Sequence, residues 1–84
     1  RPDWAKPHFY LGKLLLGRDD LKGAQAEFEQ AVRLDPAKPD YHYQLANLYR
    51  QLGLERQAKL HFERFREISA SERKKRMPLV LAQP

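Results

Sequence analysis

The sequence contains no cysteine, which excludes disulfide scaffolds, thiolate metal sites and cysteine nucleophiles. It also contains no threonine, and Ser69 and Ser71 are its only serines, so hydroxyl-based nucleophilic catalysis has almost no side chain to use. Apolar runs are short, the longest being residues 14–16 and 79–82. A membrane-spanning helix needs roughly 18 apolar residues, so we expect no membrane span.

The length and composition of the chain limit the size and the class of the protein. Its 84 residues suffice for one small domain at most, which is too small for a large enzyme core with a deep pocket. A hydrophobic share of 42% is too high for a typical disordered chain. The chain starts with Arg1 and shows no signal-peptide layout, so we expect a fragment or a processed product, and the sequence predicts no particular compartment.

The sequence predicts helices throughout. Val32, Ile68 and Val80 are its only β-branched residues, so strand signals are missing. Four segments carry apolar residues at helical spacing, with short loops between them. They run from about residue 5 to 16, from 21 to 34, from 41 to 52 and from about 54 onward. Short loops make neighbouring helices antiparallel, which predicts a stack of helical hairpins.

Turn and cap residues mark the ends of these segments. Asp19 or Asp20 is placed to cap the second helix, because an aspartate oxygen accepts hydrogen bonds from free backbone N–H groups. Asp40 is placed to cap the third helix in the same way. Gly53 marks the end of the third helix, as a glycine just past a helix often does.

Comparing the sequence with itself reveals an internal repeat with a period of about 34 residues. We call this offset, which leads from His8 to His42, one repeat period. Most of the matched positions are apolar or small residues of the amphipathic patterns, and we expect them to be buried. The identical pairs are His8/His42, Leu11/Leu45, Leu14/Leu48, Ala24/Ala58, Phe28/Phe62 and Glu29/Glu63. A single hairpin cannot bury its apolar face, so hairpins of this kind stack on their neighbours.

The repeat resembles that of the tetratricopeptide repeat family, whose pattern is W-x2-L-G-x2-Y, then A-x3-F, then A and P. The matching residues are His8, Leu11, Gly12, Leu15, Ala24, Phe28, Ala31 and Pro36, then His42, Leu45, Ala46, Tyr49, Ala58, Phe62 and Phe65. The resemblance implies an all-α, right-handed stack of antiparallel helical hairpins. We expect a junction from a preceding repeat, two repeats, and a basic C-terminal extension with an apolar tail, at residues 1–4, 5–38, 39–72 and 73–84.

Two histidines depart from the family pattern, since His8 and His42 stand where the family has tryptophan. A metal site is one interpretation, but neither a cysteine nor an HExxH-like partner accompanies them. We favour imidazoles packed between helices and predict no metal or other cofactor. The sequence also lacks a phosphate-binding glycine loop and a catalytic pair of carboxylates, so it predicts a protein that is not an enzyme.

The end of the second copy also departs from the pattern, because Ala70 stands one repeat period after Pro36, where the family has its terminating proline. The fourth helix therefore either continues through residues 69–76 or gives way to a separate short helix. In the second case, Ser69 and Glu72 would form a capping box. We favour continuation.

Residues near both ends of the chain bear on whether it belongs to a longer array of repeats. Pro2 lies one repeat period before Pro36, which suggests that further repeats precede it. Phe65 stands where the family has a small alanine, and we expect the apolar tail to fold back over it as a terminal cap. The tail residues concerned are Met77, Leu79, Val80 and Leu81. The alternatives are a disordered tail and a tail that docks on another chain.

The resemblance implies a protein–protein interaction scaffold that binds a peptide or protein segment on the concave face of the stack. The first helix of each repeat lines that face in this family. The residues expected there lie off the packing stripes, and they are Phe9, Lys13, Leu16, Tyr43, Asn47 and Arg50. Aromatic side chains beside a few polar groups are typical of interface hot spots. The alternative is a solvated inner face with Phe9 partly packed.

A second hypothesis is structural, namely a C-terminal cap or dimerising end of a longer solenoid that self-associates through exposed repeat ends. A third is contact with RNA or an acidic protein, or a localisation signal, because the stretch 56–76 carries the whole net charge of +5. The basic patch expected there comprises Arg64, Arg73, Lys74, Lys75 and Arg76. We favour a solvated helix end over nucleic-acid binding, since no aromatic residue interleaves the cations at 73–76.

Overall fold

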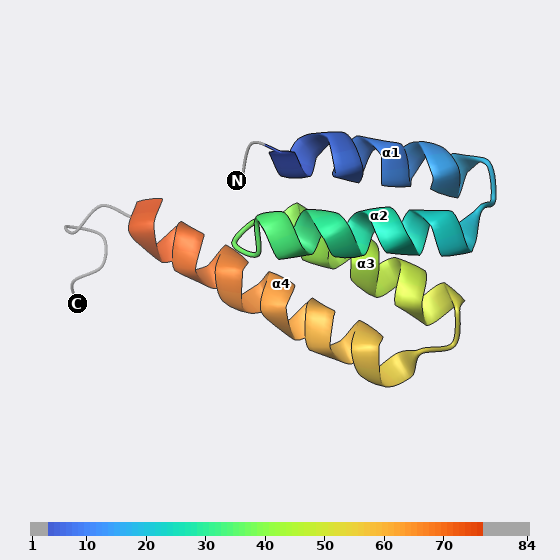
Figure 1. The fold of residues 1–84 in the computed structure, drawn as a ribbon. Helices are drawn as coiled ribbons and strands as arrows, with labels where there is room; N and C mark the ends of the chain where they lie inside the picture. Colours follow the sequence, from blue (N-terminus) through green and yellow to red (C-terminus); the bar gives the residue numbers. More distant parts are fainter. Residues whose placement is uncertain (1–3, 77–84) are drawn as a thin grey trace, which may run out of the picture.

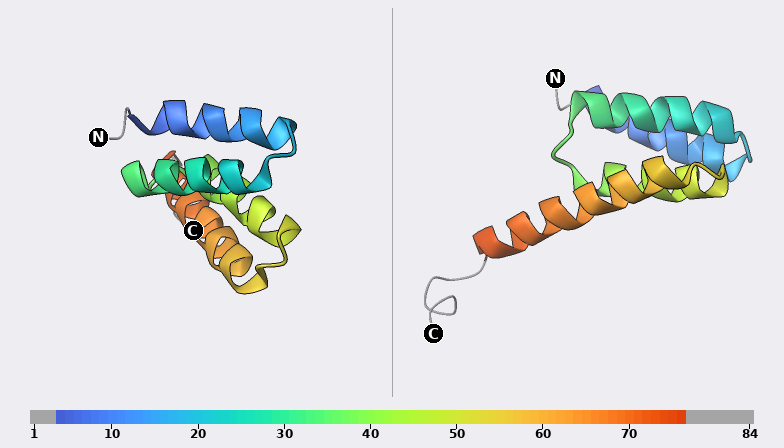
Figure 2. Two further views of the ribbon diagram at one scale, coloured as in Figure 1. Left: turned by 45° about the vertical axis from the view of Figure 1, so that its right-hand side comes forward. Right: turned by 90° about the horizontal axis from the view of Figure 1, so that it is seen from below.

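The computed structural model describes residues 4–76, and this part of the chain contains four α-helices (Figure 1). The helices are α1 (Ala5–Gly17), α2 (Leu21–Leu34), α3 (Pro39–Gln51) and α4 (Glu55–Arg76). α1 pairs with α2 and α3 with α4 as antiparallel hairpins, and α2 packs on α3 to stack the two hairpins (Figures 1 and 2). The predicted all-α stack of helical hairpins is therefore confirmed.

The turns inside the two hairpins follow the sequence prediction. Oδ1 of Asp20 accepts a hydrogen bond of 3.0 Å from the backbone N–H of Gly23, so Asp20 caps α2. Gly53 follows α3 with a φ of 79°, in the left-handed region that glycine enters without cost. Asp19 occupies the equivalent turn position one repeat period earlier, with a φ of 65°.

The predicted cap of α3 is wrong. α3 begins at Pro39, its N-cap residue is Lys38, and no side chain makes a capping hydrogen bond there. Proline suits the first helical position because its fixed φ is helical and its missing N–H would have no partner anyway. Asp40 therefore falls inside the first turn, where its negative charge still interacts favourably with the helix dipole.

The core lies where α1, α2, α3 and the first half of α4 meet. Its buried apolar residues are Ala5, Phe9, Ala24, Phe28, Ala31, Tyr41, Leu45, Leu48, Tyr49 and Ala58. Gly12 allows α1 to approach α2 closely, because a Cβ on Gly12 would lie only 2.6 Å from Cε1 of Phe28. The small residue that the repeat pattern places at this position is thus required by packing.

Two leucines of the first apolar stripe are not buried, contrary to the prediction. Leu11 and Leu14 are 42% and 53% exposed, whereas their equivalents Leu45 and Leu48 are each 1% exposed. The difference arises because α3 packs between α2 and α4, while α1 has α2 as its main neighbour. The outer face of α1 is therefore an apolar surface.

α4 is a single helix of 22 residues, so it continues through residues 69–76 as we favoured, and no separate helix begins at Ser69. Without a proline in place of Ala70, backbone hydrogen bonding runs on uninterrupted. Figure 2 shows this helix continuing past the ends of the other three. The tail predicted to cover Phe65, and the junction before Trp4, lie outside the described residues.

Candidate functional site

Phe9, the first residue predicted on the concave face, lies in the core. Its side chain is 8% exposed, and its ring centroid lies 5.7 Å from that of Phe28 and 4.6 Å from that of Tyr41. Tyr41 belongs to the second hairpin, so the neighbouring hairpin covers Phe9. Phe9 is therefore not the open aromatic contact that we expected. Its side chain instead packs across the boundary between the two hairpins.

The other two residues predicted on α1 remain accessible to different degrees. Lys13 is exposed, and its Nζ lies 5.4 Å from the ring centroid of Phe9. Leu16 is half-buried and packs against the core. α1 thus offers a cation held near an aromatic ring and, one turn away, a partly covered apolar side chain.

The three residues predicted on α3 lie beside α4. Tyr43 is 44% exposed, and its ring centroid lies 5.1 Å from that of Phe65 and 6.0 Å from that of Phe62. Nη2 of Arg50 donates a hydrogen bond of 3.0 Å to Oδ1 of Asn47. The guanidinium carbon of Arg50 also lies 5.6 Å from the ring centroid of Phe62. Aromatic rings of α4 therefore support the polar and aromatic groups of α3.

The structure brings the α3 residues together but does not join them to those of α1. Within the described part of the chain, none of the hydrogen bonds or ring contacts links Lys13 to Tyr43, Asn47 or Arg50. The support from Phe62 and Phe65 was missed, because the repeat pattern predicted a buried Phe62 and the apolar tail was expected to cover Phe65. Their spacing from Tyr43 depends on how the hairpin closes, which the sequence does not state.

A groove that sequence reasoning missed runs between α3 and α4. It has a volume of about 490 Å³ and is lined by Arg50, Glu55, Ala58, Lys59, Phe62 and Arg66. Ala58 is buried and Phe62 partly buried, so the floor is apolar, while the charged side chains are exposed. The signal that could have found it is the repeat itself, which matches Ala58 and Phe62 to the fully buried Ala24 and Phe28.

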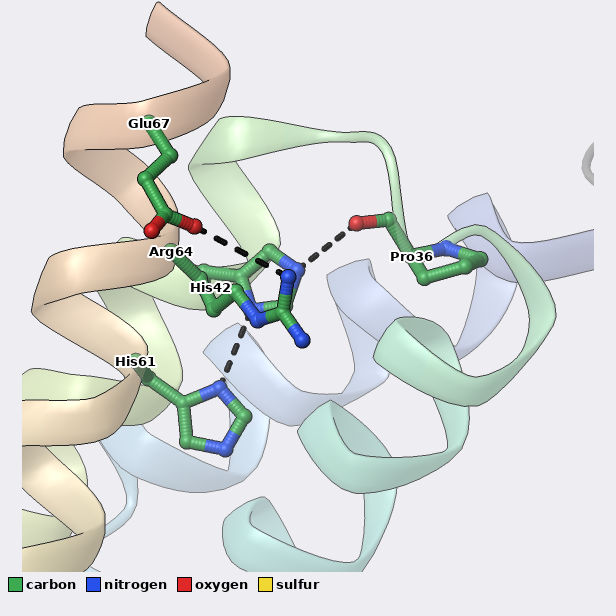
Figure 3. A network of polar contacts seen from close by, with 5 residues as sticks. All are labelled: Pro36, His42, His61, Arg64 and Glu67. Atoms are coloured by element: carbon green, nitrogen blue, oxygen red, sulfur yellow. Dashed lines mark hydrogen bonds and ion pairs between the residues drawn. The ribbon is translucent and has the colours of Figure 1, made fainter.

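His42 lies in a polar network between the hairpins (Figure 3). Its Nε2 lies 2.8 Å from the carbonyl oxygen of Pro36, and its Nδ1 lies 2.9 Å from Nδ1 of His61. Because a carbonyl only accepts, Nε2 of His42 carries the hydrogen, so Nδ1 of neutral His42 accepts from Nδ1 of His61. Burial lowers the pKa of His61, and the nearby His42 and Arg64 lower it further. His61 therefore favours its neutral form.

The histidines singled out for a metal site have other partners. Nδ1 of His8 lies 2.7 Å from Oε1 of Glu27, and His42 faces His61 and Pro36. Among residues 4–76, no group of three or more histidine, cysteine or acidic side chains is arranged to hold a metal ion. Both imidazoles thus pack between helices and make polar contacts there.

The predicted basic patch follows the second half of α4. Nη1 of Arg64 lies 3.7 Å from Oε1 of Glu67 (Figure 3), and Nη2 of Arg76 lies 3.8 Å from Oε1 of Glu72. All five basic side chains are exposed, and those at Arg73, Lys74, Lys75 and Arg76 occupy the last turn. Cations in the last turn interact favourably with the helix dipole, as the interpretation of a solvated helix end requires.

None of the helices within residues 4–76 is both long and apolar enough to cross a lipid bilayer.

Comparison with protein families matches the chain at two overlapping places. A family described as TPR repeat matches residues 12–53, and one described as Tetratricopeptide repeat matches residues 39–71. The chain belongs to the tetratricopeptide repeat family. Among curated proteins, no sequence matches it. Tetratricopeptide repeats are generally protein–protein interaction modules, and the family is one of non-catalytic scaffolds. This chain therefore carries a module of a kind that generally binds other proteins.

Proposed function

We propose that this tetratricopeptide chain binds a peptide or protein segment on the face formed by Lys13, Leu16, Tyr43, Asn47 and Arg50. The observation that carries the proposal is the exposed ring of Tyr43, which Phe65 supports at a centroid distance of 5.1 Å. An aromatic side chain held in place loses little conformational freedom on binding, which suits a hot spot. We take the two repeats to be residues 5–38 and 39–72.

The polar groups of this face define the chemistry of the partner. Arg50 carries five N–H donors and no acceptor, and Lys13 likewise only donates. One donor of Arg50 is used by Asn47, which fixes the guanidinium beside the ring of Phe62. Groups that only donate pair with carboxylates or peptide carbonyl groups. We therefore propose a partner segment that offers backbone carbonyls or acidic side chains next to an apolar residue.

A peptide display library selected against the 84-residue chain tests this function. The affinity of the selected peptides should fall at least about tenfold for Tyr43→Ala and for Asn47→Ala, as expected for hot-spot residues. Tyr10→Ala is the matched control, because Tyr10 is an exposed tyrosine of α1 outside the proposed face. Circular dichroism would show that each variant is folded. Equal losses for Tyr10 and Tyr43 would contradict the proposed face.

A second candidate function is structural, and one observation favours it. Leu11 and Leu14 expose an apolar face on α1 at the positions that are buried in α3. Such a face is suited to a neighbouring hairpin or to a second copy of the chain. Light scattering at increasing protein concentration should then show a growing particle, and Leu11→Glu with Leu14→Glu should restore a constant size. A constant size for the unchanged chain would exclude self-association through this face.

A further inference from the structure

The two apolar residues that form the floor of the groove between α3 and α4 have equivalents on the first hairpin that are fully buried. Ala24 and Phe28, which lie one repeat period before Ala58 and Phe62, are both 0% exposed. α3 packs on α2 of the first hairpin, and its Tyr41 contacts Phe9, whose ring lies against Phe28. The second hairpin keeps the same floor, Ala58 and Phe62, but Phe62 remains partly exposed. Phe62 therefore lacks the cover that Phe28 has, and the element that packs on the first hairpin is a helix, α3.

The charged rim of this groove has no counterpart on the first hairpin. Arg50, Lys59 and Arg66 line it. The residues one repeat period earlier are Leu16, Gln25 and Val32, which carry no charge. One acidic residue, Glu55, stands where the first hairpin has Leu21. The apolar floor is thus retained while three cations and one anion replace a neutral rim.

We propose that this groove binds an amphipathic helix of a partner protein whose apolar stripe carries acidic residues along its edges. The apolar stripe covers the exposed part of Phe62, in the way that the helix α3 packs on α2 of the first hairpin. The carboxylates pair with Lys59 and Arg66 and with the guanidinium of Arg50, which the ring of Phe62 already holds at 5.6 Å. The inference goes beyond the face proposed above, with which it shares Arg50.

Charge distinguishes this occupant from the two that the chain itself offers. α1 of a second copy would bring the exposed cations Lys6 and Lys13, and its sequence contains no acidic residue. Residues 77–84 carry no charged side chain, so they would leave the cations of the rim without partners. Like charges brought together at an interface cost several kcal/mol by order of magnitude, whereas opposite charges steer the partner and fix its register. An acidic helix is therefore the complementary partner.

Two synthetic peptides test the proposal against the full chain. Both carry the α3 sequence, residues 38–52, since α3 is the helix that packs on α2 of the first hairpin. In one peptide Gln44, Asn47, Arg50 and Gln51, which are not fully buried in α3, are all replaced by Glu, and in the other all by Lys. Fluorescence anisotropy measures binding of each labelled peptide. The Glu peptide should bind at least about tenfold more tightly than the Lys peptide, with an affinity that decreases as salt is added.

A charge-reversal variant locates the binding. Lys59→Glu with Arg66→Glu should remove the preference for the Glu peptide. Lys22→Glu with Arg33→Glu is the matched control, because it changes the net charge equally at exposed positions of α2 outside the groove, and it should keep the preference. Lys13→Ala should also leave binding unchanged, which separates this groove from the face proposed above. A Glu peptide with Leu45→Ser and Leu48→Ser should not bind, because its apolar stripe is gone.

Several outcomes would overturn the proposal. Equal affinity for the two peptides, binding of neither, or an equal loss for the α2 control would show that the groove does not select an acidic helix. Tighter binding of a peptide of residues 77–84 would make the chain's own tail the occupant. Displacement of the Glu peptide by a single-stranded RNA that loses affinity with Lys59→Glu and Arg66→Glu would make the groove a nucleic-acid site.

Discussion

The hydroxyl group of Tyr49 donates a hydrogen bond of 2.6 Å to Oε2 of Glu29, and this bond joins the second hairpin to the first. Nε2 of Gln25 donates to the same carboxylate oxygen at 3.0 Å. Burial raises the pKa of Tyr49, and the hydrogen bond and charge of Glu29 raise it further. The tyrosine therefore stays protonated and keeps its donor above the pH at which an ordinary tyrosine ionises.

Tyr49→Phe should destabilise the protein, because it removes the donor and leaves Glu29 with one fewer partner. We expect a loss of about 1 kcal/mol in the free energy of unfolding, the usual net value of one hydrogen bond. In a domain of this size that lowers Tm by roughly 4–8 °C, which a thermal melt followed by circular dichroism would detect. Tyr10→Phe, at an exposed tyrosine, is the control and should leave Tm unchanged.

Gly12→Ala should also destabilise the protein, since the new methyl group would meet Cε1 and Cδ1 of Phe28 at 2.6 Å and 2.7 Å. Phe28 is fully buried, so its ring has little room to move. Overpacking of this kind costs about 1–3 kcal/mol, measurable by urea unfolding. Gly17→Ala is the control, because its Cβ would meet nothing within 4 Å. A loss of stability at Gly17 as large as that at Gly12 would contradict the steric explanation.

The two equivalent turns should respond in opposite directions to substitution. Asp19 has a φ of 65°, so Asp19→Gly removes a Cβ from a residue in the left-handed conformation. We expect the free energy of unfolding to increase by about 0.5 kcal/mol. Gly53 has a φ of 79°, so Gly53→Ala should cost about 1 kcal/mol. Urea unfolding of both variants measures the pair of changes. Changes of the same sign would contradict a shared left-handed geometry.

Stability should decrease as the pH falls, because the pKa of His61 is lowered in the folded protein. The unfolded chain binds a proton at the ordinary histidine pKa of about 6.5, whereas the folded chain does so only at lower pH. The free energy of unfolding should therefore drop as the pH passes below about 6.5 toward the folded pKa. His61→Asn, which keeps an N–H donor toward His42, should flatten this dependence. An unchanged slope in the variant would assign the effect to other groups.

The sequence predicted the helices and much of the hairpin geometry, because these depend on local rules. Helical spacing placed all four helices, and the capping aspartate Asp20 and the glycine Gly53 marked turns that the structure confirms. The small residue at Gly12 followed from the repeat pattern and is explained by Phe28. Each of these predictions needed only neighbours within one hairpin.

Most of the predictions that failed needed knowledge of the neighbouring helices. Periodicity put Leu11 and Leu14 on an apolar stripe, but it does not state whether a helix covers that stripe. Phe9 was expected to be open because its covering side chain, Tyr41, belongs to the next hairpin. The cap at Asp40 failed for a local reason, because Pro39 starts the helix one residue earlier.

The uninterrupted course of α4 has a mechanical consequence. With 22 residues and a rise of about 1.5 Å each, it is roughly 33 Å long, and only its first half carries a buried residue, Ala58. Its final turn, Arg73–Arg76, is exposed. Amide hydrogen exchange should therefore quicken steadily along one continuous helix, from the anchored end to the tip. α4 therefore projects a cluster of positive charge beyond the ends of the other three helices.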